Sequence, residues 1–373
     1  MRFLHTADWH IGKKLHGFDL VEEQRDAYQQ ILAIADEEHV DAVVIAGDLY
    51  DRKVASELSV NELDDMIRDL NLTHHYPILA ISGNHDSATR LGSGSHWYEA
   101  TQFYLHTTVA QAMKPVELDD TQFFLLPYFE PFQVRHFFED DAIQNVQQAM
   151  NRLVTEMQQQ FDPSKKHVLV AHFFAAGSEH VDSETSVEVG GLDAIAVDSL
   201  SAFDYVALGH LHGKDALHAE KVKYSGSPVK FSLSEANQQK GVWIVDTAEM
   251  STAFKTITPV KDIQVLTESF ETLIDPKYYE TVNRDNFIAI SLADTQQITD
   301  VMARLRKIYP SIISIDRQNG IEIAEQQSRV DPNLDPLVLL DHFYEEATGG
   351  SLTNEQHKWA ALTLTDAMGE ETV

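Results

Sequence analysis

Cysteine is absent from the 373 residues of the chain. Its absence excludes disulfide bonds, cysteine-based zinc fingers and thiol nucleophiles, and it agrees with a reducing compartment. Long apolar runs are missing too. No stretch comes near the roughly 18 uncharged apolar residues of a transmembrane helix, and the first residues, MRFLHTADWH, lack the apolar segment of a signal peptide. We therefore expect a soluble protein of the cytoplasm with no membrane attachment.

Positive charge is scarce in this sequence. There are 28 lysines and arginines against 59 aspartates and glutamates, which gives a net charge of −31. A surface this acidic repels nucleic acid over most of its area, so a nucleic-acid function would require a local positive patch, bound cations or a basic partner. Histidine, in contrast, is frequent, with 18 residues.

Five short apolar runs in the first 212 residues predict β-strands. Each is rich in Val, Ile, Leu and Ala and is continuous rather than alternating, which is typical of strands buried on both faces. They are MRFLHTAD at 1–8, VDAVVIAGD at 40–48, YPILAISGN at 76–84, KHVLVAH at 166–172 and FDYVALGH at 203–210. Helical patterns at 20–39, 59–71 and 142–161 lie between them. This alternation predicts an α/β fold, a layered β-sandwich flanked by helices.

The pattern changes after residue 215. Residues 221–233, 240–246 and 253–260 look like antiparallel strands that complete the sheet, and a smaller strand–helix–strand unit follows. Residues 331–336 read DPNLDP, which is typical of a linker, and two helices with apolar stripes come after it. Those stripes must be buried either against the chain's own domain or against a partner helix. We predict a main domain at 1–264, a small α+β domain at 265–330, and a linker with two helices at 331–373.

The five apolar runs share one feature, because each ends in residues of the types that bind metal ions. These residues are Asp8 and His10, Asp48 and Asp51, Asn84 with His85 and Asp86, His172, and finally His210 and His212. The carboxyl ends of strands in such a sheet meet at one edge. Burying so many polar groups together without cations would be costly. Each motif alone could be a turn or an exposed loop, but their joint occurrence after five buried strands predicts a metal site.

The spacing of these residues supports the same interpretation. In an extended segment residues i and i+2 point the same way, so Asp8 with His10, and His210 with His212, can face one cleft. The glycines before Asp48, Asn84 and His210 permit tight turns and close approach. Carboxylate, imidazole and amide ligands without sulfur suit manganese, iron or zinc better than calcium or magnesium. About seven ligands fit two ions that share a carboxylate, an arrangement that serves phosphoryl displacement.

The order DxH, GDxxD, GNHD, H, GHxH resembles the calcineurin-like metallophosphoesterase superfamily. Within it, the stretches DWHIG, GDLYD, GNHDS, GHLH and YSGSPVKFSLSE, together with the C-terminal layout, resemble the SbcD family of nuclease subunits over the whole chain. The resemblance implies that one metal is held by Asp8, His10, Asp48 and His212, and the second by Asp48, Asn84, His172 and His210. It also implies that His85 stands beside the scissile phosphate, that Asp86 orients the His85 ring, and that Asp51 supports the ligands by hydrogen bonding.

The resemblance also implies an activity and partners. Members of this family are manganese-dependent 3′-to-5′ exonucleases and hairpin endonucleases of DNA recombination, replication and repair, active at the nucleoid. They work with a coiled-coil ATPase of the SbcC type. The unit at 265–330 would be a capping domain beside the DNA, and the helices of 331–373 would dock on the ATPase. A homodimer, formed through helices near the site, would give a heterotetramer with the ATPase; candidate segments are 56–70 and 94–105.

Three functional classes remain to be separated. The first is a DNA nuclease subunit, the second is a related phosphodiesterase or phosphatase that acts on small phosphoesters, and the third is a non-enzymatic scaffold that docks the ATPase. The intact set of ligands disfavours the scaffold. Cations that follow the motifs could form a basic rim for DNA, or they could be scattered surface charges; they are Lys13, Lys14, Arg52, Lys53 and Arg90.

Overall fold

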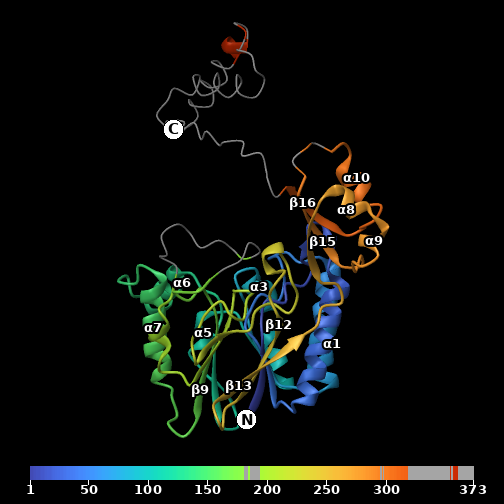
Figure 1. Cartoon of the computed structure of the whole chain (residues 1–373). Coiled ribbons are helices and arrows are strands. Elements are labelled where there is room, and N and C mark those ends of the chain that lie inside the picture. The colour runs from blue at the N-terminus through green and yellow to red at the C-terminus, as the bar shows by residue number, and fades with distance from the viewer. Residues whose placement is uncertain are drawn as a thin grey trace. The chain divides into compact units, whose positions relative to one another are not determined.

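The computed structural model describes residues 1–179, 184, 194–294, 296, 298–317, 353 and 356–359 (Figure 1). The chain divides into two compact units, residues 1–292 with 298–315 and residues 293–297 with 316–373. The strands and named helices below belong to the first unit, except for the end of the last strand.

The larger of two facing sheets has six strands. Their order is β13 (Ser251–Ile257), β12 (Lys240–Asp246), β1 (Arg2–Thr6), β4 (Ala42–Ile45), β5 (Ile78–Ile81) and β6 (Phe103–His106). β1, β4, β5 and β6 are parallel, and β12 is antiparallel to both β1 and β13. Three of the predicted strands, β1, β4 and β5, are neighbours, so their carboxyl ends lie together.

The smaller sheet has five strands and carries the other two predicted strands. Their order is β11 (Val222–Tyr224), β10 (Tyr205–Gly209), β9 (Lys166–His172), β8 (Thr121–Leu126) and β7 (Val116–Leu118). β8 to β11 are parallel, and β7 is antiparallel to β8. The carboxyl ends of β9 and β10 therefore also lie side by side.

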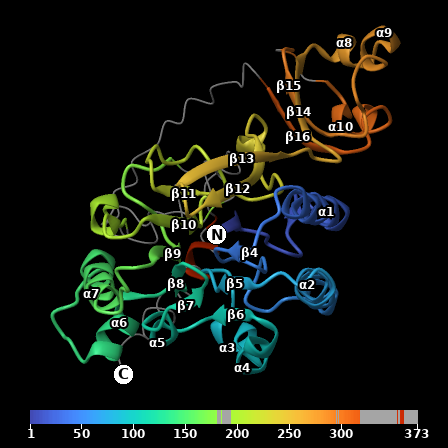
Figure 2. The ribbon, with the colours of Figure 1, turned by 90° about the horizontal axis from the view of Figure 1, so that it is seen from below.

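The core consists of side chains between the sheets and of helices on their outer faces. The side chains packed between the sheets are almost fully buried and include Phe3, Val44, Leu79, Phe123, Val170 and Tyr205. The helices α1 (Val21–Glu37) and α2 (Glu57–Arg68) lie on the outer face of the larger sheet. The helices α6 (Pro131–Phe138) and α7 (Val146–Gln158) lie on the outer face of the smaller sheet, as Figure 2 shows. Because both faces of each central strand are covered, its buried side chains are largely apolar, with His5 of β1 as a buried polar exception. The predicted α/β sandwich is confirmed.

Short elements complete the main sandwich. They are β2 (Lys14–Leu15), β3 (Phe18–Asp19), a π-helical turn Asp69–Thr73 after α2, α3 (Ala88–Leu91), α4 (Ser95–Tyr98), α5 (Val109–Ala112) and 3₁₀ turns at Glu99–Thr101, Val197–Leu200 and Leu233–Glu235.

A smaller three-stranded sheet follows, in the order β14 (Ile263–Glu268), β15 (Phe287–Leu292) and β16 (Ile312–Arg317). Its helices are α8 (Phe270–Ile274), α9 (Pro276–Tyr279) and α10 (Val301–Leu305). The predicted strand–helix–strand order is present, although the helix between β15 and β16 has only five residues. The unit has its own core, and Phe287 also contacts Phe18 of the main sandwich, with ring centroids 5.8 Å apart. The division of the chain at 264 and 330 stays a prediction.

Two segments differ from their expected structure. Residues 221–233 were expected to form an antiparallel strand, but β11 is parallel to β10, because the chain crosses back before it enters the sheet edge. Residues 94–105 are only partly helical, since α4 gives way to β6. The two C-terminal helices fall largely outside the described residues. None of the helices in the described ranges is long and apolar enough to cross a bilayer.

Candidate metal centre

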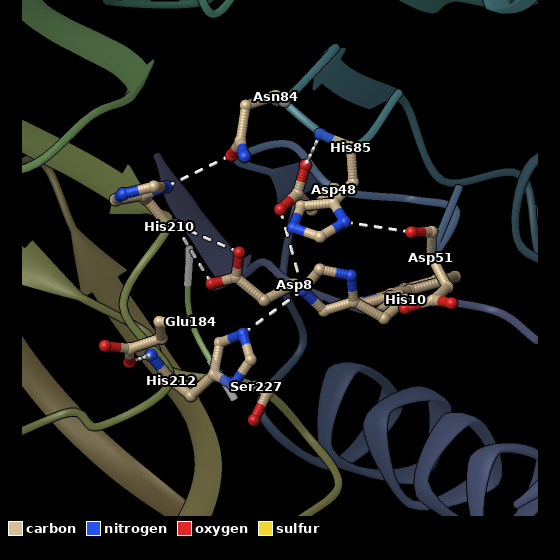
Figure 3. A network of polar contacts seen from close by, with 12 residues as sticks. Asp8, His10, Asp48, Asp51, Asn84, His85, Glu184, His210, His212 and Ser227 are labelled. Carbon is tan, nitrogen blue, oxygen red and sulfur yellow. Dashed lines mark hydrogen bonds and ion pairs between the residues drawn. The ribbon is translucent and has the colours of Figure 1, made fainter. Parts of the chain in front are cut away.

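The predicted ligand residues come together at the carboxyl ends of five strands (Figure 3). Asp8 and His10 follow β1, Asp48 follows β4, and Asn84 follows β5, all from the larger sheet. His172 ends β9, and His210 and His212 follow β10, from the smaller sheet. Asp8, His10, Asp48, His172 and His212 are buried to 2% exposure or less. The two sheets thus bring carboxylates and imidazoles into one small volume.

The backbone is strained at four of these residues. Asp8, His10, Asp48 and His210 have φ angles of 54°, 44°, 51° and 100°, in the left-handed region that ordinary residues avoid. Such a conformation costs about 1–3 kcal/mol per residue and persists where the surroundings impose it, often at functional sites. The expectation that Asp8 with His10, and His210 with His212, share a face through an extended backbone was therefore wrong, although the chain turns bring the side chains together.

Glycines allow the strand-end loops to approach one another, as the sequence predicted. A Cβ atom at Gly83 would lie 2.1 Å from Asp48 Oδ1, and one at Gly209 would lie 2.0 Å from the carbonyl oxygen of Ala46. A Cβ at Gly47, whose φ is 91°, would lie 2.5 Å from His172 Nδ1. Any side chain at these positions would displace a ligand or the backbone that carries it.

One group of donors gathers around His172. Its Nδ1 lies 2.9 Å from the carbonyl oxygen of Ala46, to which it can donate, and its Nε2 then faces Asn84 Oδ1 at 2.9 Å and Asp48 Oδ2 at 3.3 Å. Asn84 Oδ1 is also 3.1 Å from His210 Nδ1. With the proton on Nδ1, Nε2 and Oδ1 are both acceptors, so a second proton or a cation must lie between them. Burial lowers the pKa of His172, but Asp48 and Asp8 outweigh it and raise the pKa to about 9.

A second group of donors consists of Asp8, His10 and His212, whose ligand atoms all lie within 4.8 Å of one another. His10 Nε2 is 3.1 Å from His212 Nε2 and 3.5 Å from Asp48 Oδ2. The other ring nitrogen, His10 Nδ1, is buried and has no hydrogen-bond partner within the described ranges of the chain. Burial lowers the pKa of both imidazoles, so both are neutral, the form that binds metals.

The two carboxylates respond differently to this environment. Burial raises the pKa of Asp8 well above its usual value, although its oxygens accept hydrogen bonds from the backbone N–H of His210 at 2.9 and 3.2 Å. Burial acts in the same direction on Asp48, but His172 and His10 outweigh it and lower the pKa of Asp48. Asp48 therefore stays ionised between the two groups of donors, where it can serve both.

His85 and Asp86 have separate roles. The His85 N–H donates to Asp48 Oδ1 at 2.9 Å, and the His85 ring Nδ1 lies 2.8 Å from the backbone carbonyl oxygen of Asp51. Asp86 instead accepts hydrogen bonds from the backbone N–H groups of Gly83, Tyr50 and Leu49 at 2.9, 3.0 and 3.2 Å. The prediction that Asp86 orients the His85 ring is thus corrected. The backbone of Asp51 holds the ring, and Asp86 stabilises the loop that carries Asp48.

The candidate DNA-contact cations do not form one uniform patch. Lys13 Nζ lies 3.7 Å from Asp51 Oδ1, and Arg52 Nε donates to Asp51 Oδ2 at 3.2 Å, so one carboxylate offsets part of both charges. Lys14 is exposed and lies 3.9 Å from an Asp19 oxygen. The exposed Lys53 and Arg90 line a cavity of about 510 Å³ beside α2 and α4; its other lining residues include Tyr50, Ser87, Trp97 and Tyr98.

Several residues that sequence reasoning missed hold the ligands in place. Gln24 of α1 is buried, donates to the carbonyl oxygens of His10 and Trp9 at 2.8 and 3.2 Å, and accepts from Gly12 N–H at 3.3 Å. It occurs within the apolar stripe of α1, and a polar residue at such a position is a signal that could have been noticed. Glu184 accepts a hydrogen bond from His212 N–H, and Glu235 lies 3.5 Å from His212 Nδ1. No spacing rule pointed to either glutamate.

Comparisons with known proteins agree with this geometry. Residues 1–214 match the family model described as calcineurin-like phosphoesterase, and residues 259–348 match the "Type 5 capsule protein repressor C-terminal domain". The chain is 34% identical over 360 residues to the SbcD subunit of the nuclease SbcCD from Staphylococcus epidermidis, and the match covers 95% of this chain and 96% of the relative.

Two solved structures are also matched, both at low sequence identity and with TM-scores below 0.5. One is a protein of Thermus thermophilus, with 10% identity and a TM-score of 0.43, covering 69% of this chain and 99% of that one. The other is a phosphoesterase from E. coli, with 13% identity and a TM-score of 0.26, covering 69% of this chain and all of that one.

Proposed function

The chain belongs to the SbcD family of nuclease subunits within the calcineurin-like phosphoesterases, and from this premise we propose that it is the manganese-dependent 3′-to-5′ exonuclease and hairpin endonuclease of an SbcC–SbcD-type complex. The observation that carries the proposal is the facing pair His172 Nε2 and Asn84 Oδ1, 2.9 Å apart and beside the ionised Asp48. A divalent cation satisfies all three atoms at once.

The donor set fits two ions. Asp8, His10, Asp48 and His212 would hold the first, and Asp48, Asn84, His172 and His210 would hold the second, with Asp48 as the shared ligand. Imidazole, carboxylate and amide ligands without sulfur suit manganese. When bound, two such ions activate water and neutralise charge on the phosphate.

His85 supplies the proton chemistry in this proposal. Its backbone N–H donates to Asp48, and its ring Nδ1–H faces the Asp51 carbonyl oxygen, so Nε2 is the nitrogen turned to the substrate. In the doubly protonated ring, Nε2–H would donate its proton to the leaving oxygen and leave the neutral imidazole. The ring also meets His10 edge-on, with centroids 4.8 Å apart, which limits its rotation. These contacts hold His85 next to the donor groups without making it a ligand. Asp51 supports the site through its backbone.

The positive side chains near the site suggest how the DNA backbone is bound. We propose that Lys13, Lys14 and Arg52, with Lys53 and Arg90 further along the surface, form the part of this acidic chain that contacts the DNA backbone. Because Asp51 offsets part of the charge of Lys13 and Arg52, the subunit alone should bind DNA weakly. The residues 265–330 would cap the DNA path, and the ATPase partner, docked on the helices of 331–373, would supply the remaining affinity.

Surface apolar residues support a homodimer through α2 and α4. Trp97 is 81% exposed and lines the 510 Å³ cavity together with Leu72 and Tyr98, which are also partly exposed. Leu58 of α2 is 80% exposed. Contiguous exposed apolar surface of this kind marks interaction sites. We propose that a second copy of the chain covers it, which would place two nuclease sites in one heterotetramer with the ATPase.

The deciding experiment measures manganese-dependent degradation of an end-labelled DNA duplex by the purified chain. His85→Ala and Asp48→Ala are assayed in parallel, with a small chromogenic phosphodiester as a second substrate. Cleavage of DNA by the wild type and by neither variant supports the proposal. Turnover of the small diester with intact DNA, even with the ATPase partner present, would favour a phosphodiesterase of small phosphoesters instead.

A further inference from the structure

A segment of unassigned role, residues 225–239 between β11 and β12, runs along the loop that carries His212. A Cβ at Gly226, whose φ is 75°, would lie 2.5 Å from the carbonyl oxygen of His212, and Ser227 N–H donates to that oxygen at 3.1 Å. Figure 3 shows Ser227 next to His212. The Phe231 ring packs edge-on against His10 and His212, with centroids 5.4 and 5.5 Å away. The stretch YSGSPVKFSLSE therefore packs against the candidate ligands His10 and His212.

A buried carboxylate in this segment faces the imidazole of His212. Glu235 has no exposed surface, and its Oε1 lies 3.5 Å from His212 Nδ1. The same oxygen accepts hydrogen bonds from Ser232 Oγ at 3.0 Å and from Phe231 N–H at 3.2 Å. With its position set by these two donors, Glu235 can receive the Nδ1 proton of His212, which leaves Nε2 as the metal-binding nitrogen.

A buried lysine holds both the carboxylate and the His212 backbone. Lys240 opens β12, its side chain is 3% exposed, and its ammonium donates to Glu235 Oε2. Its Nζ also lies 2.9 Å from the carbonyl oxygen of His212, 2.9 Å from Gln238 Oε1 and 3.0 Å from Ser227 Oγ, so its three N–H groups are shared among four oxygens. The strand β12 pairs with β1, which precedes Asp8 and His10. Lys240 therefore connects this pair of strands with the loop that carries His212.

A fully buried ion pair is weak evidence for stability, because an apolar pair of similar volume often serves as well. Here both members contact the same histidine, one at the ring and one at the backbone. We propose that the Glu235–Lys240 pair positions His212 for the ion held by Asp8, His10 and His212. The inference rests on the metal assignment made above. His172, in contrast, is oriented by the backbone carbonyl of Ala46, so the second ion should not depend on the pair.

The test measures manganese binding by titration calorimetry on the full chain. Glu235→Gln keeps the shape but removes the charge that holds the imidazole. Loss of a group that orients a metal-binding histidine lowers metal affinity by roughly 10- to 100-fold. We expect that loss for one of two ions and an unchanged affinity for the other. Glu23→Gln is the matched control, because Glu23 is also buried and lies 3.4 Å from a lysine, Lys261, but contacts none of the proposed ligands.

The outcomes separate this inference from the proposed function. If the wild type binds no manganese, both the metal assignment and this inference are wrong. If the wild type binds two ions and Glu235→Gln, folded by circular dichroism, binds both equally well, only the inference is overturned.

A measurement on the wild type covers the case in which Glu235→Gln does not fold. The ¹⁵N chemical shifts of labelled histidine, with His212 assigned by comparison with His212→Gln, report which ring nitrogen carries the proton. A proton on Nδ1 supports the positioning role. A proton on Nε2 alone overturns it.

Discussion

Replacing His5 by glutamine should remove part of the acid sensitivity of this fold. His5 lies on β1, fully buried between the two sheets, where Nε2 is 3.2 Å from the carbonyl oxygen of Leu208 and Nδ1 is 3.0 Å from the hydroxyl of Tyr205. Burial lowers the pKa of His5 to about 3, from 6.5 in the unfolded chain. The folded protein therefore keeps His5 neutral at pH values where the unfolded chain protonates it.

The sign and the size of the effect follow from this shift. Between pH 6.5 and 3 the unfolded state binds one more proton than the folded state at His5, so the free energy of unfolding falls as the pH falls. The slope is about 1.4 kcal/mol per pH unit. From pH 7.5 to 5.5 the His5 contribution to the loss of stability is therefore about 1.4 kcal/mol. Above pH 6.5 the stabilisation is fully present.

Urea unfolding at pH 7.5 and 5.5, in EDTA so that metal binding does not contribute, measures this difference. Glutamine can replace both hydrogen bonds of the imidazole but cannot be protonated, so His5→Gln should lose about 1.4 kcal/mol less than the wild type over this range. His218→Gln, at an exposed position, is the control and should follow the wild type. Equal losses for the wild type and His5→Gln would refute the reasoning.

The other predictions concern the metal centre and its surfaces. Gly83→Ala, which places a Cβ 2.1 Å from Asp48 Oδ1, should fold but bind manganese at least about 10-fold more weakly by calorimetry. Ser82→Ala on the same loop is the control and should bind manganese like the wild type. Tight manganese binding by Gly83→Ala would contradict the assignment of Asp48 as a ligand. Alanine at four of the five candidate rim cations, Lys13, Lys14, Arg52 and Lys53, should weaken duplex binding and flatten its salt dependence. Alanine at Lys165 and Lys166, at the opposite end of β9, should do neither. Leu58→Glu should convert the proposed dimer to a monomer in sedimentation velocity. Phe132→Glu, at another exposed apolar residue on α6, is the control and should leave the dimer intact. A monomeric wild type would exclude the dimer. Deletion of 331–373 should abolish copurification with the ATPase partner while manganese binding persists, and retained copurification would place the docking surface elsewhere.

The positions of the five ligand-bearing strands and the types of residue that follow them could be predicted from the sequence. Central strands of a sandwich are covered on both faces, so they read as continuous apolar runs, and this signal is local. The polar residues at their ends stand out against that background, as GNHD does after YPILAIS. The strand β11 was misread, because the direction of a short edge strand depends on where the preceding loop returns to the sheet.

The roles of individual side chains depended on contacts between distant parts of the chain. His85 and Asp86 are adjacent in sequence, yet the ring of one is held by the backbone of Asp51 and the carboxylate of the other binds the loop of Asp48. Glu235 and Lys240 lie outside every motif of ligand residues and still reach His212.

The sequence by itself therefore determined the set of candidate ligands, their order along the chain and the kind of sheet edge on which they lie, because strand periodicity and residue chemistry are local properties. Only the tertiary structure decided the left-handed turns at Asp8, His10, Asp48 and His210, the groups that face the imidazole rings, and the ion pairs of Lys13 and Arg52 with Asp51. Those features arise where two sheets meet, and no segment specifies alone how it packs against another.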